Sequence, residues 1–376
     1  MRIGIVCYPT FGGSGVLATE LGKALADEGH QVHFITYQQP VRLNVFNTNI
    51  FYHEVRVPSY PLFDYPPYEI ALASSMVDVI LNHDLDLLHV HYAIPHASAA
   101  YMAQQIVAKK GRKIPFITTL HGTDITLVGR DSTYEPVVTF SINESSAITA
   151  VSQNLKDETN KWFTIDKEIE VIHNFVDTSR FKKKPIDAFK KVIAPQNEKV
   201  FVHASNFRKV KRVQDVVHTF AEVHKQMPAR LLMIGDGPER PVMEDLCKEL
   251  GVQDDVKFLG KQEQMEEILL VSDIFLLTSE YESFGLAALE AMAARVPVIS
   301  TNAGGLPEVN LHGVTGYTAD VGDVTTMSEY ALQMLQDEVL FEQLRENAFQ
   351  QAQKFDLQNI IPLYEKMYSR FCRMQC

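Results

Sequence analysis

Two glutamates stand eight residues apart in a segment from 280 to 290 that reads Glu-Tyr-Glu-Ser-Phe-Gly-Leu-Ala-Ala-Leu-Glu. An apolar run precedes it, and the alanines and leucines after Gly285 favour a helix. The first backbone N–H groups of such a helix lack partners within it and can bind an anion. Glu282 then precedes the helix, Glu290 lies in its second turn, and a carboxylate can accept two sugar hydroxyls. The segment could therefore hold both ends of a nucleotide sugar, although a helix-start charge and a surface charge explain the glutamates as well.

The five positions from Arg208 to Arg212 include four cations and directly follow a strand expected at Val200–Ala204. The chain as a whole is acidic, with 35 Lys and Arg against 47 Asp and Glu and a net charge of −12. Cations at the start of a helix oppose its dipole, so a bound anion would stabilise them. We interpret Arg208 and Lys211 as phosphate ligands; the alternative is a solvated run of surface charge.

Two further loops follow expected strands in the first half of the chain. Gly12-Gly13-Ser14-Gly15 leads into a helix expected to begin near Val16, and its small residues would let backbone N–H groups approach a ligand. It matches neither the dinucleotide fingerprint nor the P-loop, so a simple tight turn explains it equally well. His121 and Asp124 follow another strand, and this position favours a functional histidine over a structural one.

The elements that would position these residues are short β-branched runs that alternate regularly with helical segments. This alternation predicts an α/β fold with parallel sheets. The pattern occurs twice, so we expect two doubly wound, Rossmann-like domains that face one another across a cleft. Ligands of such sheets bind outside the carboxyl ends of the strands. The strands are expected at Ile3–Cys7, Val32–Thr36, Leu87–His91, Phe116–Leu120 and Ala147–Ala150, and then at Val200–Ala204, Arg230–Gly235, Val256–Leu259, Ile274–Leu277 and Val298–Ser300.

The length of 376 residues also requires more than one domain. We expect an N-terminal domain over residues 1–168 and a second domain over residues 169–355. The stretch Ile169–Pro185, with its basic run Lys182-Lys183-Lys184-Pro185, would connect them and act as a hinge. An amphipathic helix over residues 356–376 is expected to pack back on the first domain.

Composition narrows the function further. With 46% hydrophobic and 22% charged residues the chain is typical of a globular protein, and its acidity argues against nucleic-acid binding. No signal peptide or spanning segment is evident, so we expect a cytoplasmic protein without stable membrane association. A homo-oligomer is possible. The four cysteines form no C-x-x-C pair, which argues against a zinc or disulfide framework. No Asp-x-Asp pair follows an expected strand, so we expect turnover without a metal or another cofactor.

The two-glutamate segment, Met233-Ile234-Gly235-Asp236-Gly237-Pro238 and Gly304-Gly305-Leu306-Pro307-Glu308 together resemble family 4 retaining glycosyltransferases of the GT-B fold. The resemblance implies that the second domain binds a nucleoside diphosphate sugar and the first binds the acceptor. It makes Glu282 a ligand of the sugar hydroxyls, Glu290 a ligand of the ribose and Lys211 the phosphate-binding lysine. The arginine usual five residues before that lysine is here Asn206, so its role is assigned to Arg208.

The implied catalytic residues are His121, Lys211, Arg208 and Glu282. The implied donor-binding residues are Gly13, Asn206, Gly235, Lys261, Gln262, Ser283, Phe284, Gly285, Leu286 and Glu290. Lys261 and Gln262 would border the base, and His121 would lie near the reacting face of the sugar. The resemblance also implies retention of configuration, with the acceptor hydroxyl attacking on the face that the phosphate leaves.

Longer strings resemble one subgroup of this family, whose members transfer N-acetylglucosamine to L-malate in the first step of bacillithiol biosynthesis. These strings are Cys7-Tyr8-Pro9, Tyr65-Pro66-Pro67-Tyr68, His91-Tyr92-Ala93-Ile94-Pro95-His96, Thr118 to Thr126 and Ser205 to Val216. The resemblance implies UDP-N-acetylglucosamine as donor and L-malate as acceptor, and it accounts for Asn206.

Malate has two carboxylates and a hydroxyl, so its site needs several hydrogen-bond donors and a cation. From their places in loops or at strand ends we expect Ser14, Arg42, Tyr92 and Thr119 to bind it. By resemblance, Asn174 is an interdomain asparagine of the same site. For Tyr92, a partly buried ring with a solvated hydroxyl is an equal alternative.

Other functions remain open at this point. A different small or lipid acceptor would keep the fold and the donor. A nucleotide-sugar epimerase would act without malate, and a noncatalytic nucleotide-sugar sensor would bind without turnover. A lipid acceptor is disfavoured by the lack of an evident basic amphipathic helix in the first half of the chain.

Overall fold

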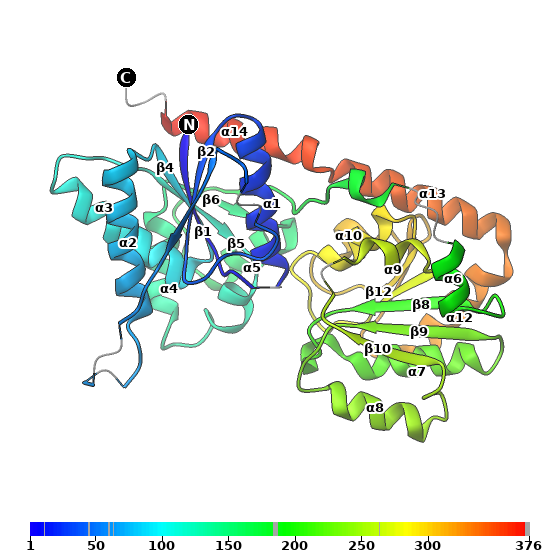
Figure 1. Cartoon of the computed structure of the whole chain (residues 1–376). Helices are drawn as coiled ribbons and strands as arrows, with labels where there is room; N and C mark the ends of the chain where they lie inside the picture. The colour runs from blue at the N-terminus through cyan, green and yellow to red at the C-terminus, as the bar shows by residue number, and fades with distance from the viewer. Residues whose placement is uncertain are drawn as a thin grey trace. The chain divides into compact units, whose positions relative to one another are not determined.

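The computed structural model describes residues 1–10, 12–43, 46–58, 61–62, 64–182, 187–262 and 264–372. The chain divides into two compact units, which are coloured by residue number in Figure 1. Unit 1 comprises Met1–Asn174 and Leu357–Cys376, and unit 2 comprises Phe175–Asp356.

Unit 1 is built on a seven-stranded sheet in the order β3-β2-β1-β4-β5-β6-β7. Every neighbouring pair is parallel. The strands are β1 (Arg2–Val6), β2 (Gln31–Thr36), β3 (Ile50–Glu54), β4 (Leu87–His91), β5 (Phe116–Leu120), β6 (Ala147–Ala150) and β7 (Ile169–Val171). The helices are α1 (Gly13–Asp27), α2 (Tyr68–His83), α3 (Ser98–Ala108), α4 (Glu135–Glu144), α5 (Gln153–Trp162) and α14 (Leu357–Cys372), with short helical turns η1 (Ala93–Ala97), η2 (Thr123–Leu127). Every residue of β4 and of β5 is buried, as expected for central strands covered on both faces.

Unit 2 repeats this plan with a six-stranded sheet in the order β10-β9-β8-β11-β12-β13, again parallel throughout. Its strands are β8 (Lys199–Ala204), β9 (Ala229–Ile234), β10 (Val256–Gly260), β11 (Ile274–Leu277), β12 (Val298–Thr301) and β13 (Gly316–Ala319). Its helices are α6 (Asp187–Ile193), α7 (Val213–His224), α8 (Arg240–Glu249), α9 (Glu266–Leu270), α10 (Leu286–Ala293), α11 (Leu306–Val309), α12 (Val324–Gln336) and α13 (Glu338–Lys354), with short turns η3 (Thr178–Phe181) and η4 (Lys209–Lys211). Phe201 of β8 and Phe220 of α7 meet edge to face at 5.9 Å in its core.

The α/β class and the doubly wound plan are confirmed, and each predicted strand is found with ends displaced by at most one residue. Three observed strands were not predicted: β3, β7 and β13. The prediction that the first helix begins near Val16 is wrong, because α1 begins at Gly13 and includes most of the glycine-rich loop.

The end of unit 1 lies a few residues beyond the boundary expected at 168/169. β7 pairs in parallel with β6, so residues 169–171 complete the first sheet. The basic residues Lys183 to Pro185 of the expected connection, and residues 373–376 of the expected terminal helix, lie outside the described residues. α14 belongs to unit 1, where the Tyr368 hydroxyl and His89 Nδ1 share a buried hydrogen bond of 2.7 Å.

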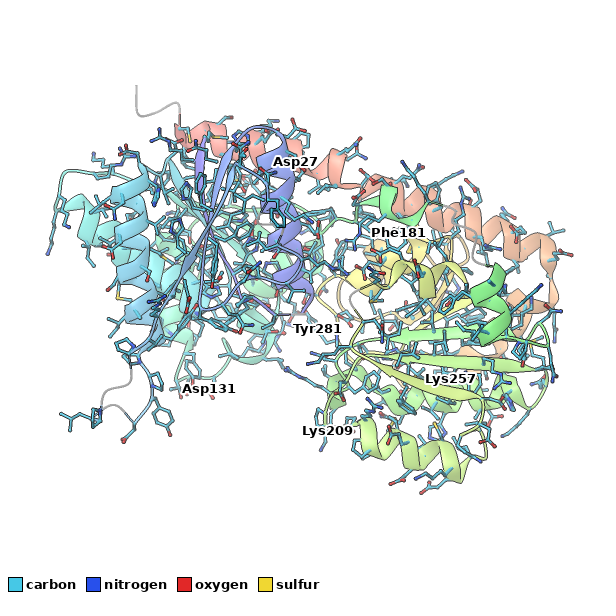
Figure 2. All side chains as sticks on the ribbon, viewed as in Figure 1. Asp27, Asp131, Phe181, Lys209, Lys257 and Tyr281 are labelled. Carbon is cyan, nitrogen blue, oxygen red and sulfur yellow. The ribbon has the colours of Figure 1, made fainter. Side chains whose placement is uncertain are left out.

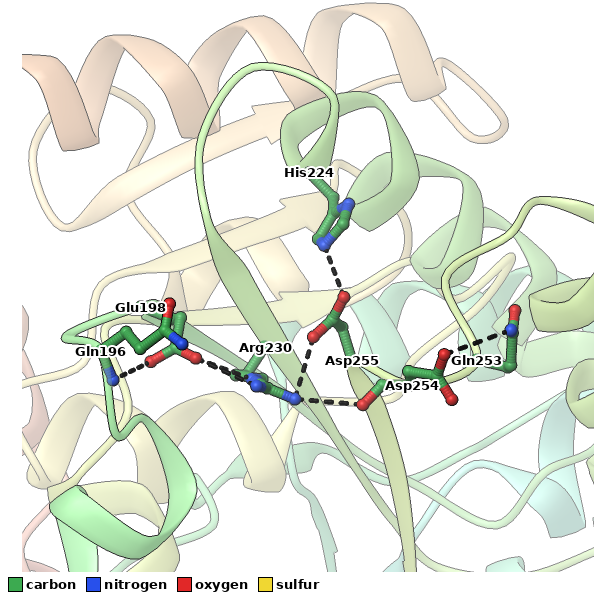
Figure 3. Close-up of polar contacts among 7 residues, drawn as sticks. All are labelled: Gln196, Glu198, His224, Arg230, Gln253, Asp254 and Asp255. Atoms are coloured by element: carbon green, nitrogen blue, oxygen red, sulfur yellow. Dashed lines mark hydrogen bonds and ion pairs between the residues drawn. The ribbon is translucent and has the colours of Figure 1, made fainter.

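A charged network closes one end of the sheet of unit 2, at the start of its strands (Figure 3). Arg230 on β9 binds Glu198 Oε1 through Nε (3.1 Å) and Nη2 (3.0 Å), and its Nη1 lies 2.9 Å from Asp255 Oδ1. Asp255 also pairs with His224 at 2.8 Å. Burial alone would raise the pKa of Glu198, but hydrogen bonds from its own and the Gln196 backbone N–H groups and from Arg230 lower it. The network ties α7 to the strands at the end opposite their carboxyl termini.

Within the described residues, none of the helices combines the length and the apolar character that crossing a bilayer requires.

Candidate active site

Each sheet reverses its strand order at one point, and the predicted site residues lie beside these two points. In unit 1 the order turns between β1 and β4, and in unit 2 between β8 and β11. At such a point the loops after the two central strands diverge to opposite faces and leave a crevice for ligands. The loops after β8 and β11 carry Lys211 and Glu282, the loop after β4 carries Tyr92, and Ser14 lies in the first turn of α1, which follows β1.

In unit 2 a short ion pair spans the switch point. Lys211 Nζ donates to Glu282 Oε1 at 2.5 Å, and the Ser279 hydroxyl donates to the same oxygen at 2.9 Å. The two charged side chains are only 18% and 16% exposed. A charge-assisted bond of this length between largely buried groups holds both side chains in one geometry. The structure therefore brings together the residues predicted to bind phosphate and sugar.

Backbone contacts fasten the two loops to each other. The Glu280 N–H donates to Val210 O at 2.8 Å, and the Thr278 hydroxyl donates to Arg212 O at 2.9 Å. Arg212 is itself bound to Asp215 at 2.6 Å, so this cation of the cluster serves the start of α7. Arg208 and Lys209 are exposed, and Figure 2 labels Lys209 at the end of the loop and Tyr281 in the segment after β11. The exposed Arg208 side chain is therefore accessible to a ligand, and it lies on the same loop as Lys211.

Glycines let the site segments approach other backbone closely. A Cβ on Gly304 would lie 2.0 Å from Glu282 O, and the Gly305 N–H donates to that oxygen at 2.8 Å. A Cβ on Gly235, where φ is 120°, would lie 1.8 Å from Ser205 O. Gly235 therefore lets its own loop pass close to the loop after β8, and the Gly304-Gly305 pair lets a second loop pass close to the Glu282 backbone.

The predicted helix start is found one residue beyond Gly285. Gly285 is the N-cap of α10 with φ 100°, and as a glycine it has no side chain to cap the first N–H groups. Leu286 is the first residue of α10, and Phe284 is buried edge to face with Phe355 at 5.5 Å. Ser283 lies between these and Glu282. The geometry leaves the amino end of α10 beside Glu282, where backbone N–H groups can bind an anion.

The remaining donor residues of unit 2 lie near the same edge. Asn206 is exposed directly after Ser205, and Lys261 and Gln262 are exposed directly after β10. Gln262 Nε2 donates to Leu259 O at 2.6 Å. Glu290 is half-buried in the second turn of α10.

In unit 1 a hydrogen bond spans the other switch point. The Ser14 and Tyr92 hydroxyls lie 2.6 Å apart. Tyr92 has φ 86°, a backbone conformation that non-glycine residues adopt at a cost and that recurs at functional sites. Burial is the main cause of a raised pKa of its phenol, and the nearby Asp124 adds to it. Tyr92 is therefore a neutral donor, held beside the amino end of α1.

Four histidines form a buried cluster next to Tyr92: His89, His91, His96 and His121. His91 Nδ1 and His121 Nε2 share a hydrogen bond of 2.8 Å, and the rings of His121 and Tyr92 lie 5.1 Å apart. Burial, with a smaller contribution from the nearby His96, lowers the pKa of His121 to about 3. Burial likewise lowers the pKa of His89 to about 3, of His96 to about 4 and of His91 well below its usual range. His121 is therefore a neutral imidazole that can donate or accept one hydrogen bond.

Asp124 is buried beneath this cluster. Its Oδ2 accepts the Ala93 N–H at 2.9 Å and its Oδ1 accepts the Gly122 N–H at 3.0 Å. Burial raises the pKa of Asp124 to about 6, although these backbone bonds oppose the shift. The residue orients the turns after β4 and β5, which carry Tyr92 and His121.

Three expected acceptor residues and Gly13 remain. Thr119 is 1% exposed, and its hydroxyl bonds His89 Nε2 and Thr149 Oγ1 at 2.7 Å each, so it lies inside the unit and not among the groups that face solvent. Arg42 is half-buried after β2 with φ 64°, and Asn174 is the last residue of the first part of unit 1. Gly13 is exposed at the first position of α1.

A pocket of about 550 Å³ lies beside Tyr92 within unit 1. Tyr8, Val128 and Tyr134 supply apolar surface, and Glu69 and Asp124 supply carboxyl groups. The described residues that line it include acids and no cation.

Comparisons with known proteins bear on both units. The family described as Glycosyltransferase Family 4 matches residues 11–180, and the family described as Glycosyl transferases group 1 matches residues 186–354. The N-acetyl-alpha-D-glucosaminyl L-malate synthase of Bacillus anthracis is 48% identical over 370 residues, covering 98% of this chain and 96% of that protein. The chain is a family 4 glycosyltransferase.

Two other similarities concern the fold of this glycosyltransferase and the breadth of its family. A solved structure of Anabaena HepE in complex with UDP and glucose is 21% identical, with a TM-score of 0.83 over 98% of this chain and 99% of that one, which confirms the GT-B fold. The 2-deoxystreptamine N-acetyl-D-glucosaminyltransferase of Niallia circulans is 25% identical over 95% of this chain and 97% of that protein.

The glycosyltransferase also has site residues that the sequence analysis missed. Ser279 holds Glu282, and His203, which bonds Ser205 at 2.7 Å and Leu276 O at 2.8 Å, supports the loop after β8. Burial lowers the pKa of His203 to about 4. His91 likewise holds His121, through the 2.8 Å hydrogen bond between their rings. Each stands in or next to a strand end, which was the available signal, but the contacts of His203 with Leu276 and of His91 with His121 join different strands.

Proposed function

We propose that this glycosyltransferase transfers N-acetylglucosamine from UDP-N-acetylglucosamine to the hydroxyl of L-malate with retention of configuration, as the first step of bacillithiol biosynthesis. The observation that carries the proposal is the 48% identity, over nearly the full length of both chains, to a protein named for this reaction. Both proposed substrates are cytoplasmic metabolites, so the cytoplasm is the expected setting.

Unit 2 is the proposed donor half. Loss of the diphosphate develops negative charge on its oxygens and positive charge on the sugar ring, so electrostatic stabilisation is the main requirement. Lys211, exposed Arg208 and the amino end of α10 would stabilise the diphosphate, and Glu282 would accept sugar hydroxyls. The 2.5 Å contact between Lys211 and Glu282 supports this arrangement, because it holds a cation next to the carboxylate that binds the sugar. Glu290 would bind the ribose, and Lys261 and Gln262 would border the base.

Charge neutralisation by protein groups alone is part of the proposal. The leaving phosphate oxygen would take the proton of the attacking hydroxyl, so neither Glu282 nor Glu290 is needed as a nucleophile. A sugar found covalently attached to Glu282 would refute this same-face reaction.

Unit 1 is the proposed acceptor half. Ser14, Tyr92 and His121 are neutral hydrogen-bond donors at its switch point, and Arg42 is the proposed cation for the malate carboxylates. Thr119 contributes through His89 if at all, because its hydroxyl is buried. One observation favours a different acceptor: the pocket beside Tyr92 contains carboxyl groups and apolar rings, which suit a neutral group better than a dianion.

The test incubates the full chain with UDP-N-acetylglucosamine and a panel of hydroxy acids and neutral alcohols, and measures UDP, product mass and anomeric configuration. Release of UDP only with L-malate, with a product of α configuration, supports the proposal. Release with another acceptor keeps the donor site and refutes malate. A new nucleotide sugar without acceptor indicates an epimerase, and binding without any turnover indicates a sensor.

A further inference from the structure

Three histidines meet at the β2–β3 edge of the sheet of unit 1. They are His33 on β2, His53 on β3 and His83, the last residue of α2. One ring nitrogen of each lies within 4.8 Å of the other two, and among the described residues this is the one group of three metal-ligand side chains so placed. The sequence analysis assigned them no role.

The register of the sheet explains how they meet. His33 pairs with Phe51 and Ile35 pairs with His53, so His33 and His53 point to the same face of the sheet. His33 Nδ1 and His53 Nε2 lie 2.9 Å apart. The end of α2 then brings the ring of His83 to 4.8 Å from that of His33 and 4.9 Å from that of His53.

The innermost ring has an unused ligand atom. His33 is 1% exposed, and its Nε2 is buried without a hydrogen-bond partner among the described residues. Such a group normally finds a partner.

We propose that His33, His53 and His83 form a binding site for a divalent transition-metal ion, with Zn²⁺ as the best fit, which fastens β2 and β3 to the end of α2. Three imidazoles without a carboxylate suit zinc, nickel or copper and do not suit magnesium or calcium. Zinc–nitrogen bonds of about 2.0–2.1 Å in tetrahedral geometry separate ligand atoms by about 3.3–3.4 Å. The three ligand atoms lie within 4.8 Å of one another, so the widest pair must close by at most about 1.4 Å, which side-chain rotation can supply.

The surroundings are compatible with a cation. Arg2 lies near enough to influence His33, but its guanidinium is 3.5 Å from the Asp84 carboxylate, which offsets part of its charge. The competing explanation is aromatic packing alone, since the ring of His33 stacks on Phe51 at 4.6 Å. The proposed ion takes no part in glycosyl transfer, so the inference stands independently of the proposed function.

The test uses the full chain, freed of metal with a chelator, dialysed and titrated with Zn²⁺ by calorimetry and with Co²⁺ by visible absorption. We expect one ion per chain, a tetrahedral Co²⁺ spectrum, and a Tm rise of about 5 °C or more when Zn²⁺ is about 100-fold above its Kd. His53→Ala should weaken binding at least about tenfold and reduce that rise to about half or less. His218→Ala, which alters a half-buried histidine on α7 of unit 2, should change neither.

If His53→Ala does not fold, His83→Gln tests the same site from the end of α2. Binding of Mg²⁺ in place of Zn²⁺, absence of stoichiometric Zn²⁺ binding, or Zn²⁺ affinity unchanged in His83→Gln would overturn the proposal. Aromatic packing alone predicts that His53→Ala lowers Tm equally with and without Zn²⁺.

Discussion

Replacement of Lys211 by methionine tests the donor half most directly, because it removes one charge from the pair that spans the switch point. The bond lost is charge-assisted, measures 2.5 Å and joins side chains less than one-fifth exposed. It is therefore worth more than a surface ion pair, and its removal should destabilise unit 2 by about 1.5–3 kcal/mol. If Lys211 also neutralises the leaving diphosphate, kcat should fall by about 10²–10³.

The partner variant Glu282→Gln should behave differently toward the two halves of the donor. Without the carboxylate, Lys211 is no longer held by its ion pair, so UDP should bind as well as to the wild type or more tightly. UDP-N-acetylglucosamine should bind more weakly, because a sugar-hydroxyl acceptor is lost. Calorimetric titration of each variant with UDP and with the intact donor measures both effects.

Lys209→Met is the matched control, since it removes the same charge from an exposed position on the same loop. It should leave kcat and UDP affinity within about twofold of the wild type. UDP affinity that is equally insensitive to Lys211→Met would refute the phosphate role of Lys211. If the double variant Lys211→Met/Glu282→Gln regains stability but not activity, the effect of the ion pair on folding is separate from the effect of its charges on catalysis.

Ser14→Ala or Tyr92→Phe should raise KM for L-malate about two- to tenfold with UDP affinity unchanged, since one hydrogen bond contributes about 0.5–1.5 kcal/mol; an unchanged KM in steady-state assays would remove both from the acceptor site. The buried histidine cluster is neutral when folded but titrates near pH 6.5 when unfolded, so unit 1 should lose stability as the pH falls below about 6.5 toward 4, as followed by circular dichroism. Asp124 acts in the opposite direction, because its pKa is raised to about 6 and its protonation favours the folded state as the pH falls, but it is one group against four histidines. Stability that does not change over this pH range would contradict the neutral state assigned to the histidines. Arg230→Met should destabilise unit 2 by about 3 kcal/mol in urea unfolding, because it leaves Glu198 buried without its cation, and an unchanged midpoint would count against that network. A chelator should lower Tm but leave the initial rate of transfer at 25 °C unchanged, and loss of that rate would refute turnover without metal.

The strands were predictable where burial constrains the sequence. Central strands such as β5 and β11 are buried on both faces, so their sequences are continuous apolar or β-branched runs. The strands that were missed, β3, β7 and β13, all lie at the edge of a sheet. An edge strand has a neighbour on one side only, and β3, which ends His53-Glu54, has no fully buried residue.

The site was predictable as a set of strand ends but not as a set of contacts. Lys211 and Glu282 are 71 residues apart in the sequence, and they meet because β8 and β11 are neighbours in the sheet. Strand order is a property of the whole sheet, which local patterns do not contain. Thr119 illustrates the other limit: its position near a strand end was correct, but its side chain points into the packed interior toward His89.

Unit 2 is continuous in sequence, whereas unit 1 is interrupted by it, and this has a consequence for biosynthesis. The seven strands of unit 1 leave the ribosome before unit 2, but α14, whose Tyr368 hydroxyl bonds the buried His89, is translated only after unit 2. The later-translated unit can therefore finish folding while the earlier one still lacks a covering helix. A nascent chain that is released before α14 would expose the apolar surface around His89 and become a target for chaperones or proteases.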